Sequence, residues 1–309
     1  MDILTLFNAL PGAVAQGLIW GIMAIGVYIT YKILDIADLS VDGTMCTGGA
    51  VCIVMLMNGK PMWLALLMAT VAGVLAGLAT GVLHTAMGIP AILAGILTQL
   101  GLYSVNLKIM GKSNLPINNQ KYDLIVSLLY VKGVPIYKNT IVVVIIALIV
   151  IIGVLYWFFG TELGCSLRAT GSNPNMSRAQ GINTDVNKVL GLMISNGIVA
   201  FASAFLSQYQ GFADINMGRG AIVIGLAAVI IGNVVFDKIF HNFALKLVAV
   251  ALGGVIYYVV LQIVIWLGFD TDLLKLLSAV VVAIFLALPY IKKKHFTKAP
   301  VIESAKGGN

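Results

Sequence analysis

Three carboxylates gather in a short stretch between two long apolar segments. Asp35, Asp38 and Asp42 are spaced by three and four residues, so a helix there would place them on one face. A carboxylate near hydrocarbon is costly and tends to face protein or water. Asp35 therefore fits a solvated membrane interface. For Asp38 and Asp42 a solvated interface is one possibility. Equally, they could line a polar passage or cap the following helix.

Two amide side chains interrupt other apolar segments. Gln99 and Asn196 carry groups that hydrocarbon cannot hydrogen-bond, so each must bond to a neighbouring helix or face a polar passage. Asn196 is a stronger candidate than the nearby Ser195 and Ser203, because an amide is harder to hide than a hydroxyl. The candidates for the lining or gate of a passage are therefore Asp38, Ser40, Asp42, Gln99 and Asn196.

Residues for catalysis, metal binding or phosphate binding form no recognisable pattern. The three cysteines include no C-x-x-C pair and the three histidines are far apart, which supports neither a zinc site nor a redox motif. Gly111-Lys112-Ser113 ends like a phosphate-binding loop, but Asn106 stands where the first glycine of that motif is required. We expect no catalytic residue, metal or cofactor in this chain, and no cleavable signal peptide.

The composition explains where these polar residues must sit. The chain has 309 residues, of which 60% are hydrophobic and 10% charged, against roughly 25% charged in an ordinary soluble domain. Its apolar runs approach the roughly 20 residues that cross a bilayer as a helix. The sequence predicts an all-α polytopic membrane protein and excludes a soluble enzyme, a nucleic-acid binder and a secreted disulfide scaffold. About nine spans are expected, near residues 11–31, 36–57, 61–83, 89–110, 139–159, 188–208, 218–236, 243–267 and 273–290.

The net charge of +7 indicates membrane orientation better than it indicates an anionic partner, because the Lys and Arg lie in loops and in the tail. The spans make residues 1–290 one membrane domain, followed by a basic tail at 291–309. The lysines of the tail predict a cytoplasmic C-terminus. Counting back through nine spans places the polar segment 160–187 inside and the lysine-rich region 108–138 outside; the role of that region stays open.

The polar segment 160–187 contains signals for a short helix. Asn173-Pro174 fits a helix start, with Asn as N-cap and Pro in the first turn. Gly181 fits the left-handed residue that follows a helix end. Such a helix on the cytoplasmic face can dock into a groove of a soluble partner, or the segment can be a plain connection.

Two further patterns concern helix packing. Gly73, Gly77 and Gly81 form a small-residue ladder that lets helices approach closely, and packing within the subunit is favoured over a dimer contact. The windows 37–41 and 213–217 read Ala-Asp-Leu-Ser-Val and Ala-Asp-Ile-Asn-Met, and the expected topology places them at opposite membrane faces. They fit inverted repeats, as in many transporters, or a chance similarity.

Three of these stretches carry a family resemblance. Thr161 to Ile182 resembles the ATPase-contacting loop of permeases from ATP-binding cassette (ABC) importers of the branched-chain amino acid and ribose type. Asp38-Leu39-Ser40-Val41 resembles the start of the second span in that superfamily, although Asp42 follows where Gly is usual. Ile224 to Gly232 is similar to another run of the family, with Asn233 where a second Gly is common. The combination resembles the group associated with binding proteins for aromatic amino acids such as tryptophan and tyrosine.

The resemblance implies a type II-like ABC importer permease fold in the plasma membrane, surrounded by lipid. The implied partners are a second copy of the permease, an external substrate-binding protein and an ABC ATPase that binds ATP and Mg; no nucleic acid is expected. Residues 173–181 would be the coupling helix that docks on the ATPase. The residues implied in this coupling are Arg168, Gly171, Asn173, Pro174, Arg178 and Gly181.

Other interpretations remain. The solute is expected to be an amino acid, aromatic or branched-chain, and a sugar or nucleoside is the alternative within the superfamily. An ion-coupled transporter would need carboxylates at the membrane midplane, whereas the acidic residues are expected at span ends. An intramembrane enzyme would need paired catalytic groups, and the sequence shows none at matching depth.

Overall fold

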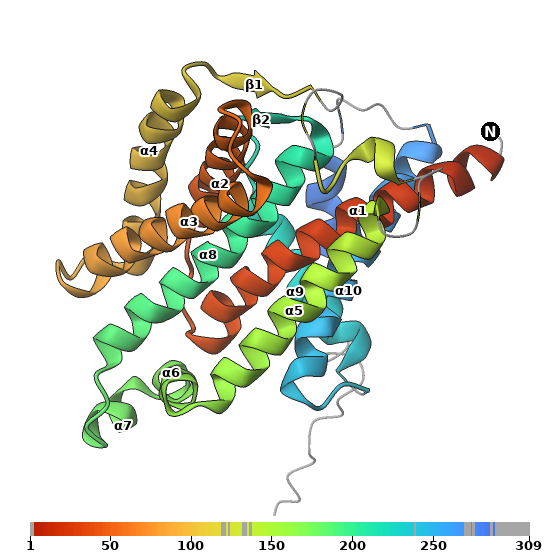
Figure 1. The fold of residues 1–309 in the computed structure, drawn as a ribbon. Coiled ribbons are helices and arrows are strands. Elements are labelled where there is room, and N and C mark those ends of the chain that lie inside the picture. Colours follow the sequence, from red (N-terminus) through yellow and green to blue (C-terminus); the bar gives the residue numbers. More distant parts are fainter. Residues whose placement is uncertain are drawn as a thin grey trace, which may run out of the picture.

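The computed structural model describes residues 3–118, 122, 124–131, 135, 138–237, 239–268, 273, 276–284 and 287, and its described part is a bundle of tilted helices (Figure 1). The elements in chain order are α1 (Ile3–Tyr28), the π-helical turn η1 (Ile29–Ile33), α2 (Val41–Met57), α3 (Met62–Thr85), α4 (Ala91–Met110), β1 (Asn114–Pro116), the 3-10 turn η2 (Leu128–Tyr130), α5 (Thr140–Gly160), α6 (Glu162–Ser172), α7 (Pro174–Ala179), α8 (Thr184–Gln210), β2 (Phe212–Asp214), α9 (Ala221–Phe236) and α10 (Phe243–Trp266).

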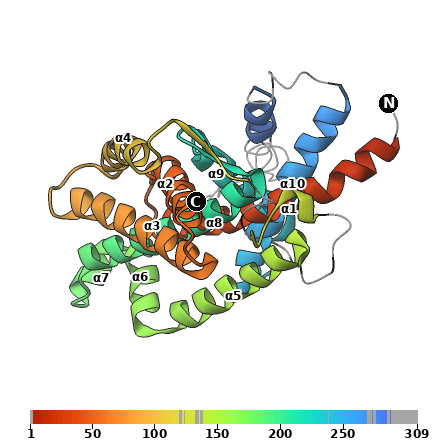
Figure 2. The same ribbon diagram turned by 45° about the horizontal axis from the view of Figure 1, so that its top comes forward.

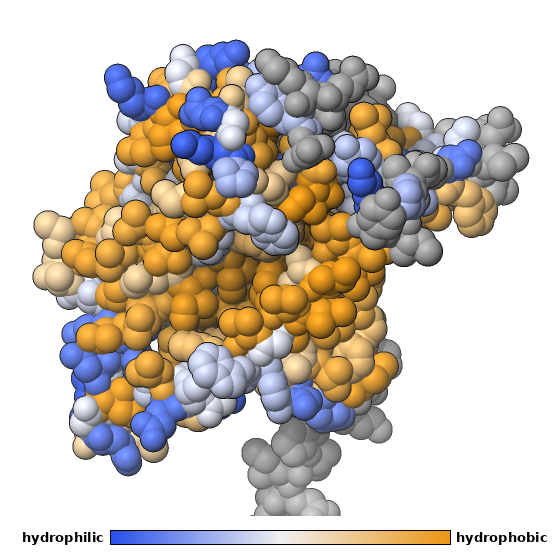
Figure 3. All heavy atoms as spheres, viewed as in Figure 1, coloured by the Kyte–Doolittle hydropathy of each residue, from blue (hydrophilic) through white to orange (hydrophobic). Residues whose placement is uncertain are grey.

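Six helices in the described residues are long and apolar enough to cross a membrane, and α2 and α9 are shorter apolar helices. These eight coincide with eight of the nine predicted spans. Of the ninth, at 273–290, residues 276–284 are helical and much of the rest lies outside the described residues. The basic tail at 291–309 lies wholly outside them. Figure 3 shows a broad hydrophobic band between hydrophilic patches at the two ends of the viewed face, as expected for a membrane-spanning bundle.

Long-range contacts define the two ends of the bundle. At one end, the Tyr209 hydroxyl near the end of α8 donates to the backbone oxygen of Gly12 in α1. At the same end β1 pairs antiparallel with β2, with Leu115 opposite Ala213. At the opposite end, Gly171 of α6 packs on the backbone of η1. We call these the β-hairpin end and the α7 end.

Helix α8 is the centre of the packing, with α3 and α4 on one side and α1 and α10 on the other (Figure 2). The glycine ladder of α3 lies against it. A Cβ added at Gly73 or Gly77 would overlap the backbone of Asn196 or Leu192, and one at Gly81 would lie 3.0 Å from Val189. The absence of side chains in this ladder lets α3 approach the α8 backbone within the subunit.

Candidate functional site

A break in helical structure separates the first two apolar helices. Helix α1 passes into the π-turn η1, the chain leaves helical geometry after Ile33, and α2 begins only at Val41. Asp35 has φ 57°, the one positive φ of a non-glycine residue in the described chain. The condition under which Asp35, Asp38 and Asp42 would share one helical face is therefore not met, because the chain is not helical between Ile33 and Val41. Asp35 itself is exposed, in agreement with its expected place at an interface.

Asp38 is buried inside this break, and both of its carboxylate oxygens are hydrogen-bonded. One oxygen accepts from the backbone N–H of Ser40 at 2.9 Å and from the Ser40 hydroxyl at 2.5 Å. The other accepts from the side-chain amide of Asn196 in α8 at 2.7 Å. A buried carboxylate is tolerable only when donors replace its lost water, and here three donors do so.

Asn196 joins three segments of the chain. Its amide group also donates to the backbone oxygen of Leu192, and its oxygen lies 2.7 Å from the donating Thr44 hydroxyl and 3.2 Å from that of Ser40. Sequence reasoning missed Thr44, although its place four residues after Ser40 in an apolar helix was a usable signal. We call Asp38, Ser40, Thr44 and Asn196 the inner polar cluster.

The inner polar cluster lies deep in the bundle. Asn196 is roughly 18 Å along α8 from Thr184 and roughly 21 Å from Gln210, at 1.5 Å per residue. The expectation that the acidic residues sit at span ends is therefore wrong for Asp38. The window 37–41 likewise lies at the depth of the middle of α8 and not at a membrane face, because the chain turns back into the bundle after η1.

Asp42 caps a second helix start within the bundle. Its carboxylate accepts from the backbone N–H of Gly220 at 2.9 Å and of Ile222 at 3.0 Å, at the N-terminus of α9. Gly220 adopts φ 84°, and a side chain at Gly218 would overlap the backbone oxygen of Asp42. The two shorter apolar helices thus begin beside each other, and Asp42 gives the orphan N–H groups and positive end of α9 a partner. This is the position where the resembling family usually has Gly.

A small cavity of about 120 Å³ opens beside Asp42. Gln99 and Asn106 of α4 line it together with Arg219. Asn106 is buried and donates to the backbone oxygen of Gly43 at 3.3 Å, while its own side-chain oxygen has no hydrogen-bond partner among the described residues. The predicted candidate Gln99 is therefore joined by Asn106 and Arg219, which sequence reasoning did not select as pathway residues.

The short helix expected in the polar segment is present as α7. The Asn173 side chain accepts from the backbone N–H of Met176 at 3.0 Å, Pro174 occupies the first turn, and Gly181 has φ 80°. Arg178 bonds to the Thr184 hydroxyl at 2.8 Å and thereby holds α7 to the start of α8. Met176 is 60% exposed, and this apolar side chain was also missed.

Arg168 and Gly171 lie on α6 and contact the membrane helices. The Arg168 guanidinium donates to the backbone oxygen of Phe159 at the end of α5, 2.8 Å away. A side chain at Gly171 would overlap the backbone oxygen of Ile33. Helix α6 therefore connects α7 to η1, directly before the helix break.

A bundle of apolar helices with a polar break near its centre is compatible with a membrane transport protein, and comparison with known proteins identifies its class. The chain belongs to the family of permease components of the branched-chain amino acid transport system, whose model matches residues 10–287. The resemblance found in the sequence is thereby confirmed, and the chain is a multi-pass permease of the ABC transporter superfamily.

Named relatives extend this result. The chain is 40% identical to a tyrosine transport system permease protein of Clostridioides difficile, over 97% of this chain and 99% of that one. It is 35% identical to the uncharacterized protein RP368 of Rickettsia prowazekii, over 93% and 99% of the two chains. A fructose import permease protein of Bifidobacterium longum is 26% identical over 80% of this chain and 68% of its own. No solved structure matches the chain.

Proposed function

We propose that this chain is the permease of an importer for tyrosine or a closely similar aromatic amino acid. The observation that carries the proposal is the 40% identity to the tyrosine permease, which extends over nearly the whole of both chains. The fructose permease shares less sequence over less of its length. A sugar therefore remains the alternative solute, and a branched-chain amino acid is the alternative within amino acids.

The proposed assembly contains two copies of the permease in the plasma membrane, an external substrate-binding protein and an ATPase that binds ATP and Mg. The polar cavity beside α4 supports a second copy. Gln99 and Arg219 line this cavity, and Tyr103 is 46% exposed next to it. Polar side chains on an otherwise apolar membrane helix favour a water-filled passage over lipid, and a second subunit would enclose that passage.

The α7 end is proposed to face the cytoplasm, with the tail beyond residue 290 on the same side. Helix α7 would dock on the ATPase, with Asn173, Pro174 and Gly181 shaping it and Arg178 fixing it to α8. Movement of α7 would reach the helix break through Arg168 and Gly171 on α6, because these residues contact α5 and η1. ATP binding can shift the permease between inward and outward states only if α7 makes different contacts in them.

The roles of the candidate pathway residues differ in this proposal. Asp42 and Gln99 would line the passage, since both border the cavity. Asp38, Ser40 and Asn196 would act as an internal latch that holds the helix break, since they bond to one another and are buried. Because donors occupy both oxygens of Asp38, the deep position of this carboxylate does not favour ion coupling.

Proteoliposomes holding the permease and its ATPase, with binding protein outside and ATP inside, test the proposal. They should accumulate labelled tyrosine, and unlabelled tryptophan should compete better than leucine or fructose at equal concentration. Competition by fructose but not by aromatic amino acids would assign a sugar instead. Uptake that persists without ATP and follows an ion gradient would overturn the ABC mechanism.

A further inference from the structure

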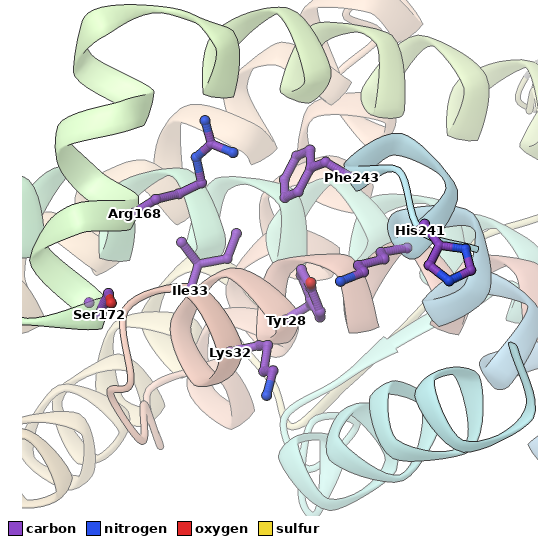
Figure 4. Close-up of a pocket in the computed structure, with 9 residues that line it drawn as sticks. Tyr28, Lys32, Ile33, Arg168, Ser172, His241 and Phe243 are labelled. Atoms are coloured by element: carbon purple, nitrogen blue, oxygen red, sulfur yellow. The ribbon is translucent and has the colours of Figure 1, made fainter. Parts of the chain in front are cut away.

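A cavity of about 580 Å³ lies at the α7 end, between η1, α6 and the start of α10. Four of its nine lining residues carry or can carry positive charge, namely Lys32, Arg168, His241 and Lys246, and none of the nine is acidic. Figure 4 shows Arg168, His241 and Phe243 around the cavity with Lys32 on the side opposite Arg168. The cations therefore come from separate elements and surround one space.

These charges lack compensation within the described part of the chain. The ion pair found there joins Arg178 to Asp185, away from this cavity. Arg168 donates to the Phe159 backbone and lies over the Phe243 ring, 5.9 Å from its centroid. Like charges brought together without a counter-charge repel one another, so an anion in this cavity would be stabilised by all of them.

A second cavity of about 510 Å³ adjoins the first and shares Arg168 and Phe243 with it. Tyr156, Trp157 and Phe159 at the end of α5 supply most of its aromatic lining. Trp157 is 71% exposed and Tyr156 51%. The pair of cavities therefore runs from a basic site to an exposed aromatic surface. Tyr and Trp are enriched where a membrane helix meets the headgroup layer.

We propose that the two cavities together bind one anionic phospholipid. The phosphate would occupy the basic cavity between Lys32 and Lys246, and the glycerol and upper acyl chains would lie along the aromatic cavity. A free phosphate ion would use the basic cavity alone and leave the adjoining aromatic surface without a role. Basic pockets between membrane helices on the cytoplasmic side bind such headgroups. A lipid bound here would contact η1, α6 and α10 and stabilise their packing.

The test is the melting temperature of the purified full-length permease in uncharged detergent. Dioleoyl phosphatidylglycerol should raise it by about 4 °C more than dioleoyl phosphatidylcholine at the same mole ratio, because a ligand that binds the folded state stabilises it. The double variant Lys32→Gln, Lys246→Gln should lose this difference while melting normally in phosphatidylcholine. The matched control Lys108→Gln, Lys112→Gln removes the same charge from exposed lysines at the β-hairpin end and should keep it.

Other outcomes would overturn the proposal. An equal rise with inorganic phosphate would assign a free anion. Retention of the phosphatidylglycerol effect by the Lys32, Lys246 variant would place any lipid elsewhere. No lipid effect, together with weaker binding of the ATPase by that variant, would make the cavity a protein docking site. Trp157→Ala examines the aromatic half and should reduce the response to the dioleoyl lipid without changing any response to phosphate.

Discussion

The inner polar cluster and the α6–α7 segment are both rich in polar residues within an apolar protein. Their hydrogen bonds differ in two ways: in the sequence separation of the bonded residues and in how deeply they are buried. Asp38 and Asn196 are 158 positions apart, and their bond is buried. The bonds of α7 join Asn173 to Met176 and Arg178 to Thr184. Asn173, Met176 and Arg178 are exposed, whereas Thr184 at the start of α8 is buried. The cluster therefore fixes how distant helices pack, whereas the segment forms locally and leaves its outer face open to a partner.

If this contrast holds, changes in the cluster reduce the free energy of unfolding, and changes on the outer face of α7 reduce coupling alone. The largest effect is expected for Asn196→Leu. This change leaves the buried Asp38 carboxylate without one donor and the Thr44 hydroxyl without its side-chain acceptor, at a cost of about 3 kcal/mol. Chemical unfolding in detergent measures the loss. The exposed Asn58→Leu is the control, and equal stability of the two variants would contradict the latch.

Gly77→Val is expected to cost about 2 kcal/mol, because the new side chain overlaps the backbone of Leu192 and pushes α3 from α8. Gly101→Val makes the same change in α4 at a position where an added Cβ meets nothing within 4 Å. The melting temperature should fall for the first variant and stay within error for the second. Similar melting of both would mean that the ladder does not fix the spacing of α3 and α8.

Asp42→Asn should cost about 1 kcal/mol, since the amide keeps one acceptor for the start of α9 but loses the negative charge near the positive helix end. Asp185→Asn removes a charge from the first turn of α8, where the side chain is 55% exposed. Thermal unfolding of the two variants should show the smaller loss at Asp185. The reverse order would argue against Asp42 as the cap of α9.

Met176→Glu is expected to leave the unfolding free energy within about 0.5 kcal/mol of the original, as usual for exposed positions. It should nevertheless weaken ATPase binding at least tenfold, because a charge replaces the exposed apolar side chain of α7. Met87→Glu is the matched control, being 66% exposed in the turn between α3 and α4 at the same end. The affinity of the ATPase for each immobilised permease variant measures the difference. An equal loss of affinity in both variants would contradict a specific docking role for α7.

The sequence predicted the parts that depend on local signals. Eight apolar helices and α7 with its Asn173 cap could be found because hydrophobicity and capping act over a few residues. The helix break could not be found this way, since the Asp38 carboxylate depends on an amide 158 positions away. For the same reason the hydrogen bond between Asp42 and the backbone of Gly220 was not predicted. Asp38 and Asp42 were nevertheless both selected as candidate residues.

The three cysteines have a practical consequence. Cys46 and Cys52 are buried, while Cys165 on α6 is exposed. A thiol-reactive fluorophore or spin label should therefore attach selectively at Cys165 in the unmodified chain, five residues after the end of α5 and eight before the α7 cap. The natural sequence thus contains its own spectroscopic attachment point, from which the motion of the coupling region can be followed during turnover without engineering a cysteine-free background.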